Sequence, residues 1–256
     1  MERASLERIF ERFLDELYAL PADRTKIIGS HELLGGTIAD SDFYIFREQS
    51  DSFTRELIED INFLVVRLHR LEAWGRVLES CSDVSEKMGI FAEFVEPLFE
   101  YALTSPYAIK NRFIYCGVKL IALTAALQSP SSPPPIPTDR EINFKTLHAF
   151  CVGCHIREDF RNAVSELNSH AFTYATREFR HRKEHRLPQK LQFGVLSVFE
   201  TEITPAGLNY SFVLQRPLRL QELIPMLHKE HQKLTEAFEK YWEMVSNLDS
   251  TLVSRS

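Results

Sequence analysis

The densest positive charge of this sequence lies in one short stretch, REFRHRKEHRLP, at residues 177–188. The ten residues from Arg177 to Arg186 include five arginines or lysines, two histidines and two glutamates. With neutral histidines, five positive and two negative side chains give this stretch a formal charge of +3, whereas the whole chain carries −6. A local basic site in an otherwise acidic protein predicts an anionic ligand.

The side chains in this stretch suit chemistry on a phosphate group. Arg177, His181 and His185 follow one another at four-residue spacing, so they would share one face of a helix, with Arg180 beside them. Arginine presents a planar fork of donors that fits a phosphate, and histidine gains or loses a proton near neutral pH. These residue types are those that metal-independent cleavage of RNA requires.

In that reaction Arg180 would hold the phosphate and stabilise charge developing on its oxygens. His185 would act as general acid or base on the ribose 2′-hydroxyl or the leaving 5′-oxygen, and His181 would orient or assist. A pair of histidines could come from His181 with His185 or from two chains of a dimer. The 2′-hydroxyl restricts this chemistry to RNA, and no cofactor or metal ion is expected. Further candidate contacts to phosphate or nucleic acid are Arg177, Arg182 and Arg186.

Other interpretations of the stretch stay open. Cations near the end of a helix are often no more than a solvated face that complements the helix dipole. Residues 181–185 also match H-x-x-E-H, an inverted zinc-protease pattern, but the surrounding cations disfavour a divalent metal. Finally, the same geometry could bind a nucleotide, RNA or a phosphoprotein without any turnover.

Most of the chain shows the 3.6-residue periodicity of amphipathic helices. A long helix from about Ser52 to Glu79 carries an apolar seam at Leu57, Ile61, Leu64, Leu68, Leu71 and Leu78. Three further helices are predicted in the first half of the chain: an N-terminal one that ends before Pro21, a shorter one near residues 91–99 that Pro97 bends or interrupts, and one opened by Pro106. Three more follow: one capped by Thr138 and Glu141 that carries Phe144, Leu147, Cys151 and Cys154, with its pattern continued by Phe160, Val164 and Leu167, one that ends in the basic stretch, and a last one from about Leu220 to Ser246.

The periodicity changes between residues 192 and 215, where a β-hairpin is predicted. Leu208, Tyr210, Phe212 and Leu214 occupy alternate positions there, and Thr204-Pro205-Ala206-Gly207 is typical of a turn. The proline-rich segment at 129–138 predicts an extended loop within one bundle. The expected fold is all-α, an antiparallel helical bundle with one small β-hairpin inserted before the last helix. We divide it into an N-terminal helix with an irregular segment, 1–50, and a helical domain, 51–250.

Composition and motifs exclude several other classes of protein. No secretory signal or apolar run long enough to cross a bilayer is evident, so a cytoplasmic protein is expected.

Cys151-Val152-Gly153-Cys154-His155 matches the pattern of c-type haem attachment, which would require export. Since these cysteines lie in an apolar helical pattern, we expect core packing, with a redox or zinc role as the alternative.

Arg180-His181-Arg182-Lys183-Glu184-His185 resembles the signature of the HEPN superfamily, in which an arginine and a polar residue precede a histidine after a spacer of four to six residues. The wider context is similar to a branch of uncharacterised bacterial HEPN-like proteins, in FRHRKEHRLP followed by a hairpin and an apolar helix, in VVRLHRLEAWGRVLE at 65–79 and in SPYAIKNRFIY at 105–115. The similarity covers residues 55–245, within the domain 51–250.

This resemblance implies an α-helical domain that forms a homodimer and brings the motifs of two chains together in a cleft. Many members are metal-independent ribonucleases of toxin–antitoxin or phage-defence systems, and others only bind nucleotides. We therefore expect a metal-independent endoribonuclease of toxin or defence type, with an antitoxin or defence partner. The alternative is a non-catalytic module of the same fold that binds a nucleotide, RNA or another protein.

Overall fold

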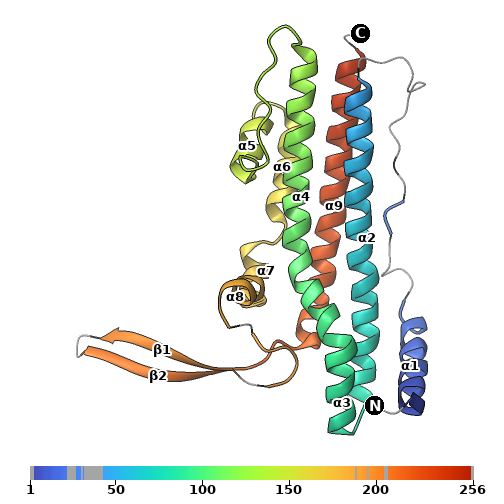
Figure 1. Ribbon diagram of the computed structural model, residues 1–256, viewed down its shortest axis with the longest axis vertical. Coiled ribbons are helices and arrows are strands. Elements are labelled where there is room, and N and C mark those ends of the chain that lie inside the picture. Colours follow the sequence, from blue (N-terminus) through green and yellow to red (C-terminus); the bar gives the residue numbers. More distant parts are fainter. Residues whose placement is uncertain are drawn as a thin grey trace. The chain divides into compact units, whose positions relative to one another are not determined.

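The computed structural model describes residues 3–21, 27–29, 31, 43–187, 189–194, 196–204 and 207–254. It confirms the predicted all-α fold with a β-hairpin inserted before the last helix (Figure 1). The helical elements are α1 (Arg3–Tyr18), α2 (Tyr44–Ser80), α3 (Val84–Ile90), the π-helical turn η3 (Phe91–Val95), α4 (Glu96–Gln128), α5 (Phe144–Cys151), α6 (His155–Glu166), α7 (His170–Ala175), α8 (Phe179–His185) and α9 (Leu220–Val253).

The chain forms two compact units, and the three longest helices contribute to both. Unit 1 comprises Met1–Arg24, Arg67–Thr104 and His170–His228, and unit 2 comprises Thr25–Val66, Ser105–Ser169 and Lys229–Ser256. In each unit the segment of α2 runs antiparallel to those of α4 and α9 (Figure 1). Within each unit the segments of α4 and α9 run in the same direction (Figure 1).

The core of unit 1 centres on Trp74 of α2. Its indole is stacked between Phe13 of α1 and Phe94 of η3, with ring centroids 4.3 Å apart on each side. Aromatic rings bury large apolar areas, and well-packed pairs add about 0.5–1.5 kcal/mol beyond that burial. This stack therefore fixes α1 and η3 on α2, and the predicted seam residues Leu68, Leu71 and Leu78 are buried beside it.

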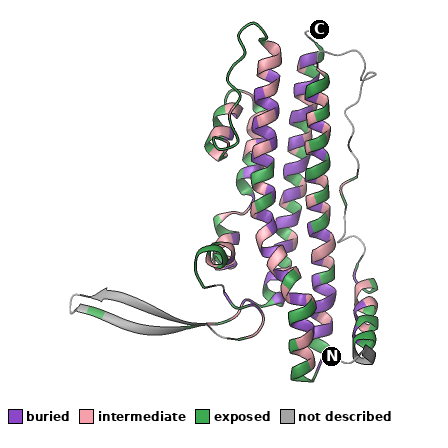
Figure 2. Cartoon of the chain, viewed as in Figure 1, coloured by how far each residue is buried: buried purple, intermediate pink, exposed green. Residues whose placement is uncertain are grey.

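The core of unit 2 is a cluster of aromatic rings from three helices. Phe113 of α4, Phe160 of α6 and Tyr241 of α9 lie within 6.3 Å of one another, centroid to centroid. Gly117 lets α4 approach α6 closely, because a Cβ at this position would lie 2.5 Å from Cε1 of Phe160. The buried faces of the long helices are coloured purple in Figure 2.

Several predicted helix boundaries differ from the structure, and the last helix, expected to end near Ser246, runs to Val253. The helix expected from about Ser52 begins at Tyr44, and α4 runs through Pro106, where a new helix was expected. An internal proline removes a helix hydrogen bond at a cost of about 3 kcal/mol. Apolar residues on both sides of Pro106 offset this cost by burial, namely Phe99, Ala102, Leu103, Ile109 and Phe113.

The hairpin pairs β1 (Leu196–Thr204) with β2 (Gly207–Gln215) in antiparallel register, from Leu196 opposite Gln215 to Thr204 opposite Gly207. Pro205 and Ala206 of the predicted turn lie outside the described residues, as does much of the segment 22–42.

The division of the chain into an N-terminal segment, 1–50, and a helical domain, 51–250, stays a prediction. In the described part of the chain no helix is long and apolar enough to cross a membrane.

The tight contact at Gly117 makes a testable prediction. Gly117→Ala should lower the free energy of unfolding by about 1–3 kcal/mol, because the buried Phe160 ring must shift in a packed core. Gly75→Ala in α2 is the matched control, since its Cβ would meet only Leu220 Cδ1 at 3.6 Å. That variant should be unchanged or more stable by up to about 1 kcal/mol. Urea unfolding measures both, and equal effects of the two substitutions would contradict the proposed contact.

Candidate anion-binding site

The basic stretch does not form one continuous helix. Helix α7 ends after Ala175, and Arg177 and Glu178 follow with φ angles of 51° and 55°. The Glu178 N–H donates to the Thr173 carbonyl at 2.8 Å and the Arg177 N–H to the Tyr174 carbonyl at 2.9 Å. This pair of bonds is a Schellman motif, in which glycine normally occupies the position held here by Arg177.

Helix α8 begins immediately after this turn at Phe179, whose side chain is buried. Our expectation that Arg177 shares a helix face with His181 and His185 is therefore wrong, because Arg177 lies in the left-handed turn before α8. A non-glycine residue in this conformation costs about 1–2 kcal/mol. Strained residues of this kind cluster at functional sites, which directs attention to the Arg177 side chain.

Several cations of the stretch are held by acceptors in unit 1. Lys183 Nζ lies 2.5 Å from Glu100 Oε2 of α4. Arg182 Nη1 donates to Gln215 Oε1 at 2.8 Å, and Arg177 Nη1 donates to the backbone carbonyl of Arg216. These bonds tie α8 and the preceding turn to α4 and to the end of β2.

Arg180 and His185 approach the same carboxylate oxygen. Oε2 of Glu184 lies 3.5 Å from Arg180 Nη1 and 3.8 Å from His185 Nε2. The rings of His181 and His185 lie on successive turns with their centroids 5.1 Å apart. Arg180 and His185 are five residues apart, about 140° around an ideal helix, and their long side chains are what allow both to reach Glu184. An anionic oxygen thus already occupies the position between the predicted phosphate clamp and the predicted acid or base.

The predicted site residues differ in how accessible they are. His181, His185 and Arg186 are exposed, and the His185 side chain retains 60% of its accessible surface. Arg180 and Arg182 are half-buried. The histidines therefore stand open to a large ligand rather than inside an enclosed cavity.

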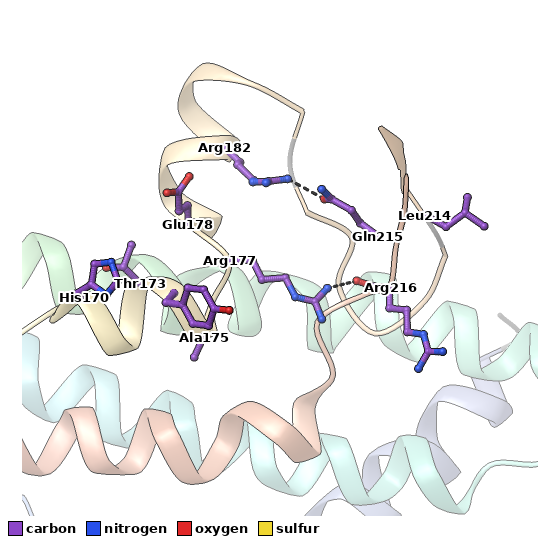
Figure 3. A pocket seen from close by; sticks show the side chains of 10 residues that line it. His170, Thr173, Ala175, Arg177, Glu178, Arg182, Leu214, Gln215 and Arg216 are labelled. Carbon is purple, nitrogen blue, oxygen red and sulfur yellow. Dashed lines mark hydrogen bonds between the residues drawn. The ribbon is translucent and has the colours of Figure 1, made fainter. Parts of the chain in front are cut away.

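A pocket of about 740 Å³ is lined by Arg182 of α8 and by residues of neighbouring segments (Figure 3). It is formed by α7, the left-handed turn, Arg182 of α8 and the end of β2. Of the six predicted residues, Arg177 and Arg182 line it, whereas Arg180, His181, His185 and Arg186 do not. The lining residues that the sequence analysis did not predict as site residues are His170, Thr173, Tyr174, Ala175, Glu178, Leu214, Gln215 and Arg216.

Comparison with protein families, curated proteins and solved structures finds no match to this chain. A proposal for the function therefore rests on the geometry of the site and on the resemblance of its motif.

The C-x-x-C-H motif at 151–155 lies in unit 2. Cys151 ends α5 and is fully buried, and this burial raises the pKa of its thiol to about 11. Cys154 lies after a turn in which Gly153 adopts a φ of 83°. No group of three or more His, Cys, Asp or Glu residues that could hold a metal ion occurs among the described residues. Core packing is confirmed for Cys151 by its burial, whereas Cys154 is only partly buried and precedes α6.

The left-handed turn makes a stability prediction. Arg177→Gly and Arg177→Ala both remove the guanidinium and its bond to Arg216, but only glycine relieves the backbone strain. We expect the glycine variant to be more stable than the alanine variant by about 1 kcal/mol, measured by chemical unfolding. Equal stability would show that Arg177 is not held in the left-handed conformation in solution.

Proposed function

We propose that this protein binds RNA through the anion site of α8, formed by Arg180, His181 and His185. The observation that carries the proposal is the shared contact of Arg180 and His185 with one oxygen of Glu184. A phosphoryl oxygen has the charge and the hydrogen-bonding capacity to replace that carboxylate oxygen. Exposed ion pairs contribute only about 0–1 kcal/mol, so a polyanion displaces Glu184 at little cost.

The charge distribution favours binding at one site rather than coating. The chain as a whole carries a net charge of −6, so the rest of the surface repels a polyanion while the segment 177–186 attracts it. Salt screens the interaction between charges more than about 10 Å apart, so the attraction is confined to the neighbourhood of this segment. Arg177, Arg182 and Arg186 extend the positive surface around the anion site. This arrangement suits a few phosphates of one strand.

Metal-independent cleavage is a second candidate, favoured by the pair of histidine rings 5.1 Å apart. One histidine would accept the proton of the ribose 2′-hydroxyl as its oxygen attacks phosphorus. The other would donate a proton to the 5′-oxygen as the P–O5′ bond breaks, which leaves a 2′,3′-cyclic phosphate. Arg180 would stabilise the phosphoryl oxygens. The resemblance to the HEPN motif supports this chemistry, together with a homodimer and a neutralising antitoxin or defence partner.

Both candidates are tested with labelled single-stranded RNA in excess chelator. We expect Arg180→Ala to weaken binding roughly 10- to 100-fold, the value of a charge-assisted hydrogen bond. It should also make the RNA affinity less dependent on salt. A plot of log affinity against log salt concentration should become shallower by about 0.7, the change expected for the loss of one phosphate contact. Arg140→Ala, at an exposed arginine of unit 2, is the control. Equal affinity of the two variants would contradict the binding site.

The same incubations, resolved on a denaturing gel, test cleavage. His185→Ala should abolish product formation even at RNA concentrations that saturate the variant, so that weaker binding does not explain the loss, and His155→Ala should behave as wild type. His155 is a suitable control because its side chain is 87% exposed in unit 2. RNA left intact by the wild-type protein would reject cleavage and leave binding as the function.

A further inference from the structure

The pocket beside α8 combines an aromatic wall with guanidinium groups. Tyr174 of α7 is 77% exposed and lines the pocket together with His170. Their ring planes are within 15° of parallel, with centroids 6.4 Å apart. An exposed aromatic ring on a pocket wall is the feature on which proteins stack a nucleobase, and such stacking tolerates any base because each has a π-face.

The arginines of the pocket keep donors that their hydrogen bonds to the end of β2 do not use. A guanidinium carries five N–H donors, and the contacts of Arg177 and Arg182 described above use only Nη1 of each. The Nε atom of Arg182 is buried and has no hydrogen-bond partner in the described part of the chain. In Figure 3 the Arg177 and Arg182 side chains extend toward the end of β2, on the side of the pocket opposite His170 and Thr173.

We propose that this pocket binds one nucleotide of a single-stranded RNA, with the base stacked on Tyr174 and its phosphate on Arg177 and Arg182. The inference deepens the proposed function and rests on it for the identity of the polymer. The volume of about 740 Å³ lies within the range of small-ligand pockets. Glu178 and Thr173 at the pocket edge offer an acceptor and a hydroxyl to the base.

Single-stranded RNA is the ligand class that this arrangement selects. Bases in an RNA duplex are paired and stacked, so they cannot turn out onto a side chain, whereas unpaired bases stack on aromatic rings. Arg182 directly follows His181 in α8, a helix of only seven residues. A strand with one base in the pocket therefore passes its neighbouring phosphate over His181 and His185.

The test compares single-stranded with duplex RNA in binding to full-length protein, followed by fluorescence anisotropy. Tyr174→Ala should weaken binding of single-stranded RNA about 5- to 150-fold, the effect of losing one stacked base, and leave duplex RNA unaffected. Tyr174→Phe retains the ring and should stay within about threefold of wild type. Tyr18→Ala is the matched control, because Tyr18 is 82% exposed on α1 of the same unit and does not line the pocket.

A parallel calorimetric titration with 5′-AMP separates the pocket from the polymer site. If RNA binds and Tyr174→Ala behaves like Tyr18→Ala, the pocket assignment is overturned while RNA binding through Arg180 stands. If 5′-AMP binds in a Tyr174-dependent manner and RNA does not bind, the pocket stands and the proposed function fails. Absence of binding to either ligand overturns both.

Discussion

The left-handed turn at Arg177 and Glu178 is the constraint on which the whole candidate site depends. It ends α7 through two backbone hydrogen bonds and starts α8 in a new direction, with Phe179 buried as the anchor. Without the turn, Arg177 would lie on the same helix face as the histidines. With it, the cations divide into an open anion site on α8 and a pocket between α7 and β2. An arginine at a position that favours glycine raises the energy of the fold, a trade-off expected where a side chain is needed for function.

Acidic and amide groups hold this concentration of positive charge in place. Glu100 pairs with Lys183, Gln215 accepts from Arg182, and Glu184 lies between Arg180 and His185. The first two interactions attach α8 to its neighbours, so they position the site. The third lies within α8 itself and attaches it to nothing else. In the proposed function, Glu184 would compete with an incoming phosphate for Arg180 and His185.

The sequence predicts those features that depend on local pattern. The leucine seam of α2 and the alternation in β2 follow from periodicity, and both elements lie where that periodicity places them. The break at Thr176–Glu178 could not be predicted, because no glycine or proline marks it and the helix ends through backbone bonds alone. The pocket was missed for a different reason. Tyr174 and Gln215 come together only through tertiary packing, and neither belongs to a motif, although the tyrosine three residues before Arg177 was a usable signal in the sequence.

We propose that the Glu184 carboxylate occupies the position that an RNA phosphate takes between Arg180 and His185. The most direct measurement is the affinity of the Glu184→Gln variant for single-stranded RNA in chelator, across a range of salt concentrations. Removal of the competing charge should strengthen binding about 2- to 10-fold at low salt, as expected for an exposed ion pair and its repulsion of phosphate. Glu243→Gln, which breaks a comparable exposed pair with Lys240 in unit 2, should have no effect. Unchanged or weaker binding by Glu184→Gln would contradict the account.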